Sequence, residues 1–212
     1  MSIITKRQIL EKIKNNEIGI IPTLDAFQIQ SNSIDLRLGF TFMIPKRWHI
    51  TNNGRETMDI LNFNTNNSKY FDIIELEEGQ YFDILPGEYI IVSTLETIKI
   101  PNNLMAILYP RSSTNRKGLS LDLTGIIDSG YEGQLTLPIK NNTQSHTIRI
   151  YPGERFCQII FETLTEEIKP IKSRYHNKDI IEGVAKEKNS ESTLILKGKI
   201  KQLKTDHKVN IE

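Results

Sequence analysis

Two periods of hydrophobic residues run along the chain, and the first is helical. Ile9, Leu10 and Ile13 recur at the spacing of one helix face. They follow Thr5 and Gln8, which have the spacing of a capping box. This pattern predicts one short helix near the N-terminus.

From residue 34 the hydrophobic period changes to two. Six apolar side chains alternate with mostly polar ones, namely Ile34, Leu36, Leu38, Phe40, Phe42 and Ile44. Such alternation predicts a β-strand with one buried face. The Asn-rich residues 51–70 form a polar excursion that can contain a short strand.

Strand-like runs separated by turn residues continue through the next ninety or so positions of the chain. The runs cover residues 80–84, 88–95, 104–109, 119–124, 133–140, 147–151 and 156–163. Pro-Gly and Asn-Asn pairs lie between several of them. Many short strands at this spacing predict an all-β sandwich or barrel.

Length and charge limit the domain organisation. The 212 residues suffice for one sizeable core, so we expect a single domain over residues 1–170. The pattern weakens after it, and we expect a C-terminal tail over 171–212, in which residues 193–196 can still form a strand. The 27 basic and 26 acidic residues give a formal net charge of +1, which argues against a surface committed to nucleic acid or membrane.

The cysteine content and the first residues indicate the compartment. Cys157 is the one cysteine and cannot form an internal disulfide. The opening MSIITKRQIL lacks the long apolar run of a signal peptide or membrane span. We therefore expect a cytoplasmic protein.

The segment PRSSTNRKG, residues 110–118, can form an anion-binding loop. Ser112 or Ser113 can cap a short helical turn that Gly118 would close. The hydroxyl groups and the guanidinium groups of Arg111 and Arg116 are donors suited to phosphate. The alternative is a capped surface turn with solvated arginines, and the short motif alone favours that alternative.

A second segment, TGIIDSGYEGQL, has the composition of a tight hairpin around Asp128 and Tyr131. Asp is also a common turn residue, so Asp128 gains a catalytic meaning only if it faces the phosphate loop. There it could accept the proton of a water that attacks phosphorus, with Tyr131 packed against a sugar.

Together these segments resemble the deoxyuridine triphosphatase and dCTP deaminase superfamily. Four stretches match its motifs in order, namely SNSIDLRLG (31–39), YPRSSTNRKG (109–118), TGIIDSGYEGQLTL (124–137) and PGERFCQIIF (152–161). The resemblance implies a distorted, jelly-roll-like β-barrel assembled into a homotrimer with active sites where subunits meet. It also implies Mg²⁺ held mainly through the phosphates of a deoxynucleoside triphosphate, without a metal site of the protein's own.

The resemblance assigns roles to single residues. Asp128 is the general base for the water that attacks the α-phosphorus, and Tyr131 stacks under the deoxyribose. Asp35 supports the site from the first motif. The remaining matches fall on phosphate or base contacts, namely Arg111, Ser112, Ser113, Arg116, Asp122, Gln158 and, in the tail, Arg174.

The branch of the superfamily depends on one position. The layout is similar to that of the deaminases, but Pro138 stands where they carry a glutamate that moves protons at the cytosine ring. We therefore expect hydrolysis of dUTP to dUMP and pyrophosphate, with no ammonia released from dCTP. The alternatives are a dCTP deaminase with a displaced carboxylate such as Glu132, a dCTP-hydrolysing enzyme, and a catalytically silent nucleotide-binding regulator.

Overall fold

The protein folds around one large sheet, as a computed structural model shows. The structure describes residues 2–57, 70–121, 125–169, 194–195 and 197–207. The described helices are α1 (Lys6–Lys14), α2 (Ser112–Arg116) and α5 (Ile200–Asp206). The described strands are β1 (Gly19–Ile21), β2 (Ile34–Pro45), β3 (Trp48–Thr51), β4 (Gly54–Thr57), β5 (Phe71–Glu75), β6 (Phe82–Ile84), β7 (Tyr89–Lys99), β8 (Leu104–Pro110), β9 (Leu119–Leu121), β10 (Ile126–Ile127), β11 (Glu132–Asn141), β12 (Ile148–Ile150) and β13 (Arg155–Thr163).

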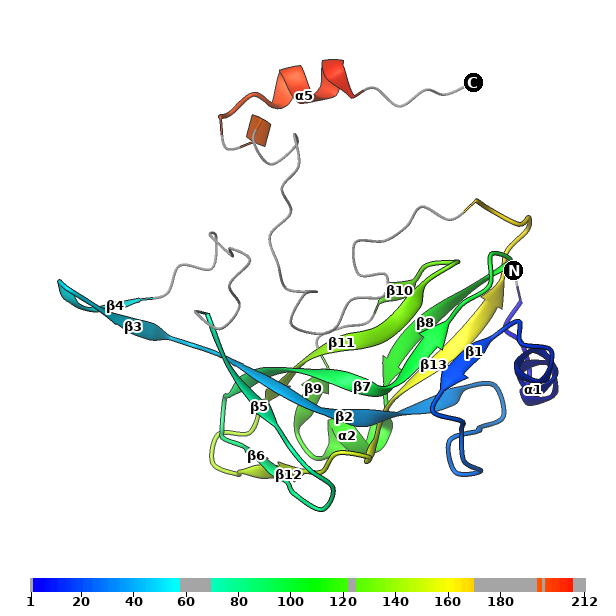
Figure 1. Ribbon diagram of the computed structural model, residues 1–212, viewed down its shortest axis with the longest axis horizontal. Helices are drawn as coiled ribbons and strands as arrows, with labels where there is room; N and C mark the ends of the chain where they lie inside the picture. The colour runs from blue at the N-terminus through cyan, green and yellow to red at the C-terminus, as the bar shows by residue number, and fades with distance from the viewer. Residues whose placement is uncertain (1, 58–69, 122–124, 170–193, 196, 208–212) are drawn as a thin grey trace.

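Nine strands form the main sheet, in the order β10-β8-β13-β2-β7-β11-β9, with β1 added to β7 and β5 added to β2. The strands β6 and β12 pair separately, and β3 and β4 form a hairpin that projects from the body (Figure 1). The sheet curls around a core that includes Phe42 and Phe82, whose rings stack with centroids 5.0 Å apart. This arrangement confirms the prediction of an all-β, distorted-barrel fold with a short N-terminal helix.

Helix α1 begins as the sequence predicts. The backbone N–H of Thr5 donates to Oε1 of Gln8 at 2.9 Å, which satisfies one free donor at the helix start. Ile9 is fully buried, whereas Leu10 is 43% exposed, so the apolar stripe of the helix is narrower than predicted.

The strand from residue 34 is confirmed as β2, but its alternation is only partial. The pairing of β2 with β7 shifts register between Leu38 and Phe42. A second apolar cluster around Met43 covers the other face of its C-terminal half, so Phe42 and Met43 are both buried. Asp35, on the polar side of the predicted pattern, is also buried.

The other strand predictions are confirmed with shifted ends, and four strands were missed. The missed strands are β1, β3, β5 and β10. The prediction of a strand over residues 193–196 is wrong for Leu194 and Ile195, whose backbone is helical. Residues 58–69 and 122–124 lie outside the described part of the chain, and the domain boundary at residue 170 stays a prediction.

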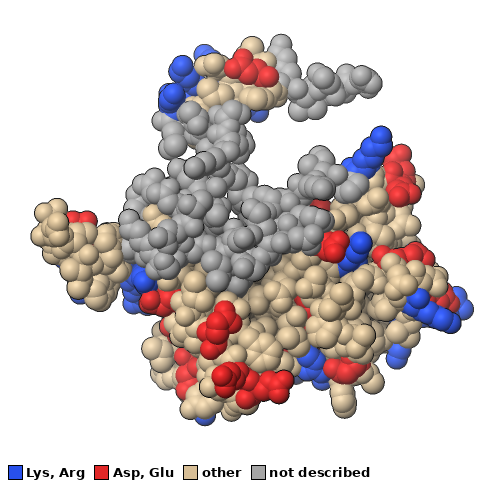
Figure 2. Space-filling view, in the orientation of Figure 1, with Lys and Arg blue, Asp and Glu red and all other residues tan. Residues whose placement is uncertain are grey.

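Both acidic and basic side chains lie on the surface, as Figure 2 shows for one face. Of the helices described, none has the length and apolar character needed to span a membrane.

Gly118, which ends helix α2, is the position where the fold of the loop is most sensitive to a side chain. Its φ is +94°, and an added Cβ would lie 2.6 Å from Cγ2 of Thr143. We predict that Gly118→Ala lowers the free energy of unfolding by ~2 kcal/mol, from backbone strain and steric clash together. Urea denaturation measures this.

The control for this substitution is Gly79→Ala. Gly79 has a similar φ of +83°, but a Cβ there would meet no atom within 4 Å. Its cost should be smaller, because only the backbone strain remains. Equal losses of stability for the two variants would show that the contact with Thr143 does not matter.

Candidate active site

The predicted anion loop forms at the end of β8, although its cap differs from the prediction. The N-cap residue of α2 is Arg111, with extended backbone angles, and Ser112 is the first helical residue. The carbonyl of Arg111 accepts hydrogen bonds from the N–H groups of Thr114 and Asn115 at 3.0 and 3.2 Å. The prediction of a serine cap is therefore wrong, because the serines lie one and two residues inside the turn. Gly118 closes the turn as predicted.

Asp35 reaches this loop from β2 and binds two arginines. Its Oδ2 lies 3.0 Å from Nε of Arg111 and 3.2 Å from Nη1 of Arg155. The Asp35 side chain is only 3% exposed. Burial raises the pKa of the Asp35 carboxyl, and the charges of Arg111 and Arg155 oppose that rise.

Arg155 was not among the predicted site residues. It lies three positions before Gln158 in the segment PGERFCQIIF, so the fourth motif contained a signal for it. What the sequence lacked was the strand pairing that brings the start of β13 beside β2.

Gln158 lies beside the same loop. Its Cα is paired with Tyr109 on one side and Asp35 on the other, and its Nε2 donates to the carbonyl of Pro110 at 3.3 Å. The strand pairing that we considered as the alternative to a ligand contact is thus present. The same pairing also holds the amide next to Arg111.

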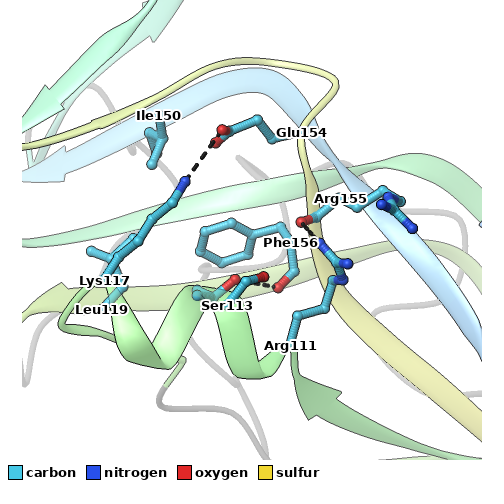
Figure 3. Close-up of a pocket in the computed structure, with 9 residues that line it drawn as sticks. Arg111, Ser113, Lys117, Leu119, Ile150, Glu154, Arg155 and Phe156 are labelled. Atoms are coloured by element: carbon cyan, nitrogen blue, oxygen red, sulfur yellow. Dashed lines mark hydrogen bonds and ion pairs between the residues drawn. The ribbon is translucent and has the colours of Figure 1, made fainter.

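A cavity of about 230 Å³ opens between α2 and the start of β13, as Figure 3 shows. Apolar side chains and charged groups share its lining, which consists of Arg111, Ser113, Thr114, Lys117, Leu119, Ile150, Glu154, Arg155 and Phe156. Nζ of Lys117 and Oε1 of Glu154 lie 3.3 Å apart across it. Ser112, Ser113 and Arg116 are exposed on α2.

The predicted carboxylate hairpin also forms. The N–H of Tyr131 donates to the carbonyl of Asp128 at 3.1 Å, which closes a turn with Gly130 at a φ of 75°. Asp128 is exposed. The phenol of Tyr131 donates to the carbonyl of Gln134 at 2.7 Å, and burial raises the pKa of Tyr131 to about 12.

Within one chain, however, Asp128 and the anion loop do not meet. Ile127 pairs with Ala106, and the hydroxyl of Ser129 donates to the carbonyl of Leu104, so the hairpin lies at the start of β8. Arg111 follows the other end of β8. The separation is roughly 20 Å, because six residues of strand rise about 3.3 Å each. The structure therefore places the two predicted half-sites, one with Arg111 and one with Asp128, at opposite ends of β8.

Pro138 lies on β11 opposite Ile91 of β7 and is half-buried. Glu132, which we considered as a displaced carboxylate, is at the far end of the same strand, with Oε2 3.6 Å from Nζ of Lys99. Six residues of strand separate Glu132 from Pro138, again roughly 20 Å. Within one chain, Glu132 therefore does not reach the place of the missing glutamate.

Two predicted contacts, Asp122 and Arg174, lie outside the described residues. Across the described parts of the chain, no three His, Cys, Asp or Glu side chains are grouped so that they could hold a metal ion. Asp35, the buried carboxylate nearest the loop, is already paired with two arginines.

Comparisons with known proteins extend these observations. A protein of Methanosphaera stadtmanae named dCTP deaminase, dUMP-forming, is 37% identical over 180 residues, which cover 84% of this chain and 86% of that protein. A Dictyoglomus turgidum protein of the same name is 36% identical over 182 residues, 82% of this chain and 90% of that protein. The crystal structure of 2′-deoxycytidine 5′-triphosphate deaminase from Agrobacterium tumefaciens has a TM-score of 0.59 and 23% identity. It covers 76% of this chain, whereas this chain covers only 48% of it, and the likeness concerns the fold.

These relatives correct the predicted activity. They are named for deaminating dCTP and forming dUMP, so the prediction of a plain dUTP diphosphatase that leaves dCTP unchanged is contradicted. That prediction gave the single residue Pro138 more weight than the deaminase-like layout of the whole chain. The sequence model of the dCTP deaminase-like family matches residues 3–164, and the chain belongs to this family.

Proposed function

We propose that the chain converts dCTP to dUMP. The observation that carries the proposal is the 37% identity, over 84% of the chain, to a protein named for this activity. The reaction has two parts. Water replaces the amino group at C4 of cytosine and releases ammonia, and a second water attacks the α-phosphorus and releases pyrophosphate.

For the second part, Asp128 is the proposed general base. Its carboxylate is exposed on a turn in which the backbone N–H of Tyr131 donates to the backbone carbonyl of Asp128. The ring of Tyr131 is proposed to lie under the deoxyribose. Guanidinium, hydroxyl and amide groups suit a triphosphate, because its oxygens accept hydrogen bonds from both charged and neutral donors. The proposed phosphate contacts are Arg111, Ser112, Ser113, Arg116, Gln158 and, from the tail, Arg174.

Mg²⁺ is proposed to enter on the phosphates of the substrate. The described residues fit an ion that is held by the substrate and not by the protein. Asp35 is already paired with Arg111 and Arg155, so it is not a free ligand. Mg²⁺ in phosphate sites is commonly held by one or two protein oxygens together with substrate phosphates. When bound, it would neutralise charge on the triphosphate.

Assembly is part of the proposed function, because the two half-sites lie at opposite ends of β8. The outer faces of β10, β8 and β13 lie between them and carry Ile126, 69% exposed, and Tyr109, 40% exposed. Ile107 and Ile160, paired on the same face, are half-buried. A second copy on this face would bring its Asp128 hairpin to the first copy's Arg111 loop, and the homotrimer implied by the resemblance would repeat that contact three times.

The first part of the reaction needs a carboxylate to replace the glutamate absent at Pro138. We propose Asp122 for this role. Asp122 follows Leu121 directly in the chain, and Leu121 pairs with Ile139, the neighbour of Pro138. Glu132 is less suitable, because it is separated from Pro138 by most of β11.

A second candidate function is hydrolysis of dCTP to dCMP and pyrophosphate without deamination. Pro138 is the observation that favours it, since proline has no group that can move a proton.

The products formed from dCTP decide between these functions. We predict that the purified full-length chain, with Mg²⁺ and dCTP, releases ammonia and pyrophosphate and forms dUMP, as measured by chromatography and a coupled ammonia assay. Formation of dCMP without ammonia would establish the second candidate and refute the first. A chain that binds dCTP but forms no product would be a silent regulator.

Asp122→Asn tests the proposed carboxylate. We predict that ammonia release from dCTP falls by ~10²-fold or more, the usual cost of losing an acid–base group, while the melting temperature is unchanged. The matched control is Glu132→Gln, which should leave ammonia release intact. If Glu132→Gln removed ammonia release and Asp122→Asn did not, the carboxylate would be Glu132.

Mixing two inactive variants tests both the base and the shared site. We predict that Asp128→Asn lowers pyrophosphate release by ~10²–10⁴-fold because the amide cannot accept the water's proton. Arg111→Ala should also be inactive, through lost phosphate binding. Unfolding the two together and refolding them should restore about one quarter of wild-type activity, because random assembly leaves that share of interfaces with both residues intact.

The exposed carboxylate Glu78 provides the control, and Glu78→Gln should behave as wild type. No restoration on mixing, from oligomers that native mass spectrometry shows to contain both variants, would place Asp128 and Arg111 in separate functions.

A further inference from the structure

The side chain of Asp35 does more than fill a buried position. Two guanidinium groups meet at its Oδ2, with Nε of Arg111 at 3.0 Å and Nη1 of Arg155 at 3.2 Å. Nε2 of Gln30 also donates to Oδ2, at 3.4 Å. A carboxylate that is 3% exposed thus lies behind two guanidinium groups that are 25% and 29% exposed.

Arg111 is held at two of its nitrogen atoms. Nε lies against Asp35, and Nη1 donates to the carbonyl of Arg155 at 3.0 Å. A guanidinium has five N–H donors in a rigid plane, so fixing one edge fixes the direction of the rest. Among the described residues Nη2 of Arg111 has no hydrogen-bond acceptor, and Arg111 and Arg155 both line the cavity of Figure 3.

Arg155 is anchored in a similar way. Its Nη1 donates to the carbonyl of Phe27 at 2.6 Å and lies against Asp35 at 3.2 Å. Two positive groups therefore meet at one carboxylate, and the trio has a net charge of +1. Without the carboxylate, the two guanidinium groups would repel each other, and neither would keep its present direction.

We propose that Asp35 is a positioning residue for triphosphate binding, which acts by orienting Arg111, with Arg155 held at the same carboxylate. The proposal rests on the phosphate role proposed above for Arg111. Preorganised charges of this kind bind an anion without a further loss of side-chain freedom.

A purely structural role for Asp35 is the alternative, because the same contacts join β2, β13 and the segment around Phe27. The two roles differ in one measurable respect. Substitution of a purely structural residue would weaken the binding of the nucleoside and of the phosphates alike. Substitution of a residue that acts through Arg111 would weaken phosphate binding only, and would have no effect once Arg111 is absent.

The test is a double-mutant cycle on equilibrium binding, with a non-hydrolysable dCTP analogue, inorganic tripolyphosphate and deoxycytidine as probes. Asp35→Asn should weaken the analogue and tripolyphosphate by about tenfold, the cost of one charge-assisted hydrogen bond, and leave deoxycytidine unchanged. In an Arg111→Ala background, the same substitution should change triphosphate affinity less than about twofold. Equal losses in both backgrounds, or an equal loss for deoxycytidine, would overturn the proposal.

Two further variants keep the test decisive. Asp83→Asn removes a more exposed carboxylate from a pair with Arg149, at 2.8 Å, and should not change triphosphate affinity. If Asp35→Asn does not fold, Asp35→Glu keeps the charge but misplaces it, and should show the same dependence on Arg111. Because binding is measured without turnover, failure to form dUMP would refute the proposed function and leave this inference standing.

Discussion

The hydrogen-bonded ladder of β8 is the constraint on which the arrangement of the site depends. β8 pairs with β10 on one side and with β13 on the other, so its ends are fixed in direction and separation. The Asp128 hairpin is attached at its start, and the Arg111 loop at its end. A strand bonded on both sides cannot shorten to bring these groups together, so the half-sites stay apart in any fluctuation that preserves the sheet.

This separation explains why adjacency in sequence misleads. Arg111 and Asp128 are close in the chain, but the segment between them forms α2 and β9 and then returns along β8 through β10. The chain thus retraces its path instead of closing a pocket. Within this hairpin Tyr131 is half-buried, whereas Asp128 is exposed, so the side chain of Asp128 is accessible from outside the chain.

Much of the fold follows from the sequence, because alternation and turn residues are local signals. The capping box of α1, the long strand β2 and the loop closed by Gly118 are all predicted at or near their positions. The burial of Asp35 could not be predicted, since strand alternation assigned it to the polar face. That burial depends on Arg111, at the start of α2, and Arg155, on β13, which are distant from Asp35 in the sequence. The missed strands β1, β3, β5 and β10 are short, at five residues or fewer. Three of them, β1, β5 and β10, add to strands that were already predicted.

Pro138 shows how a correct local observation leads to a wrong function. Glu132, the replacement considered from the sequence, lies on β11 itself, where successive side chains on one face are about 7 Å apart. In a sheet, the nearest side chains are those across the strand, at about 5 Å. On one side the partner of Pro138 is Ile91, which cannot move a proton. On the other side lies the strand of Leu121, the partner of Ile139. The proposal of Asp122 as the replacement rests on this pairing, because Asp122 follows Leu121 directly in the chain.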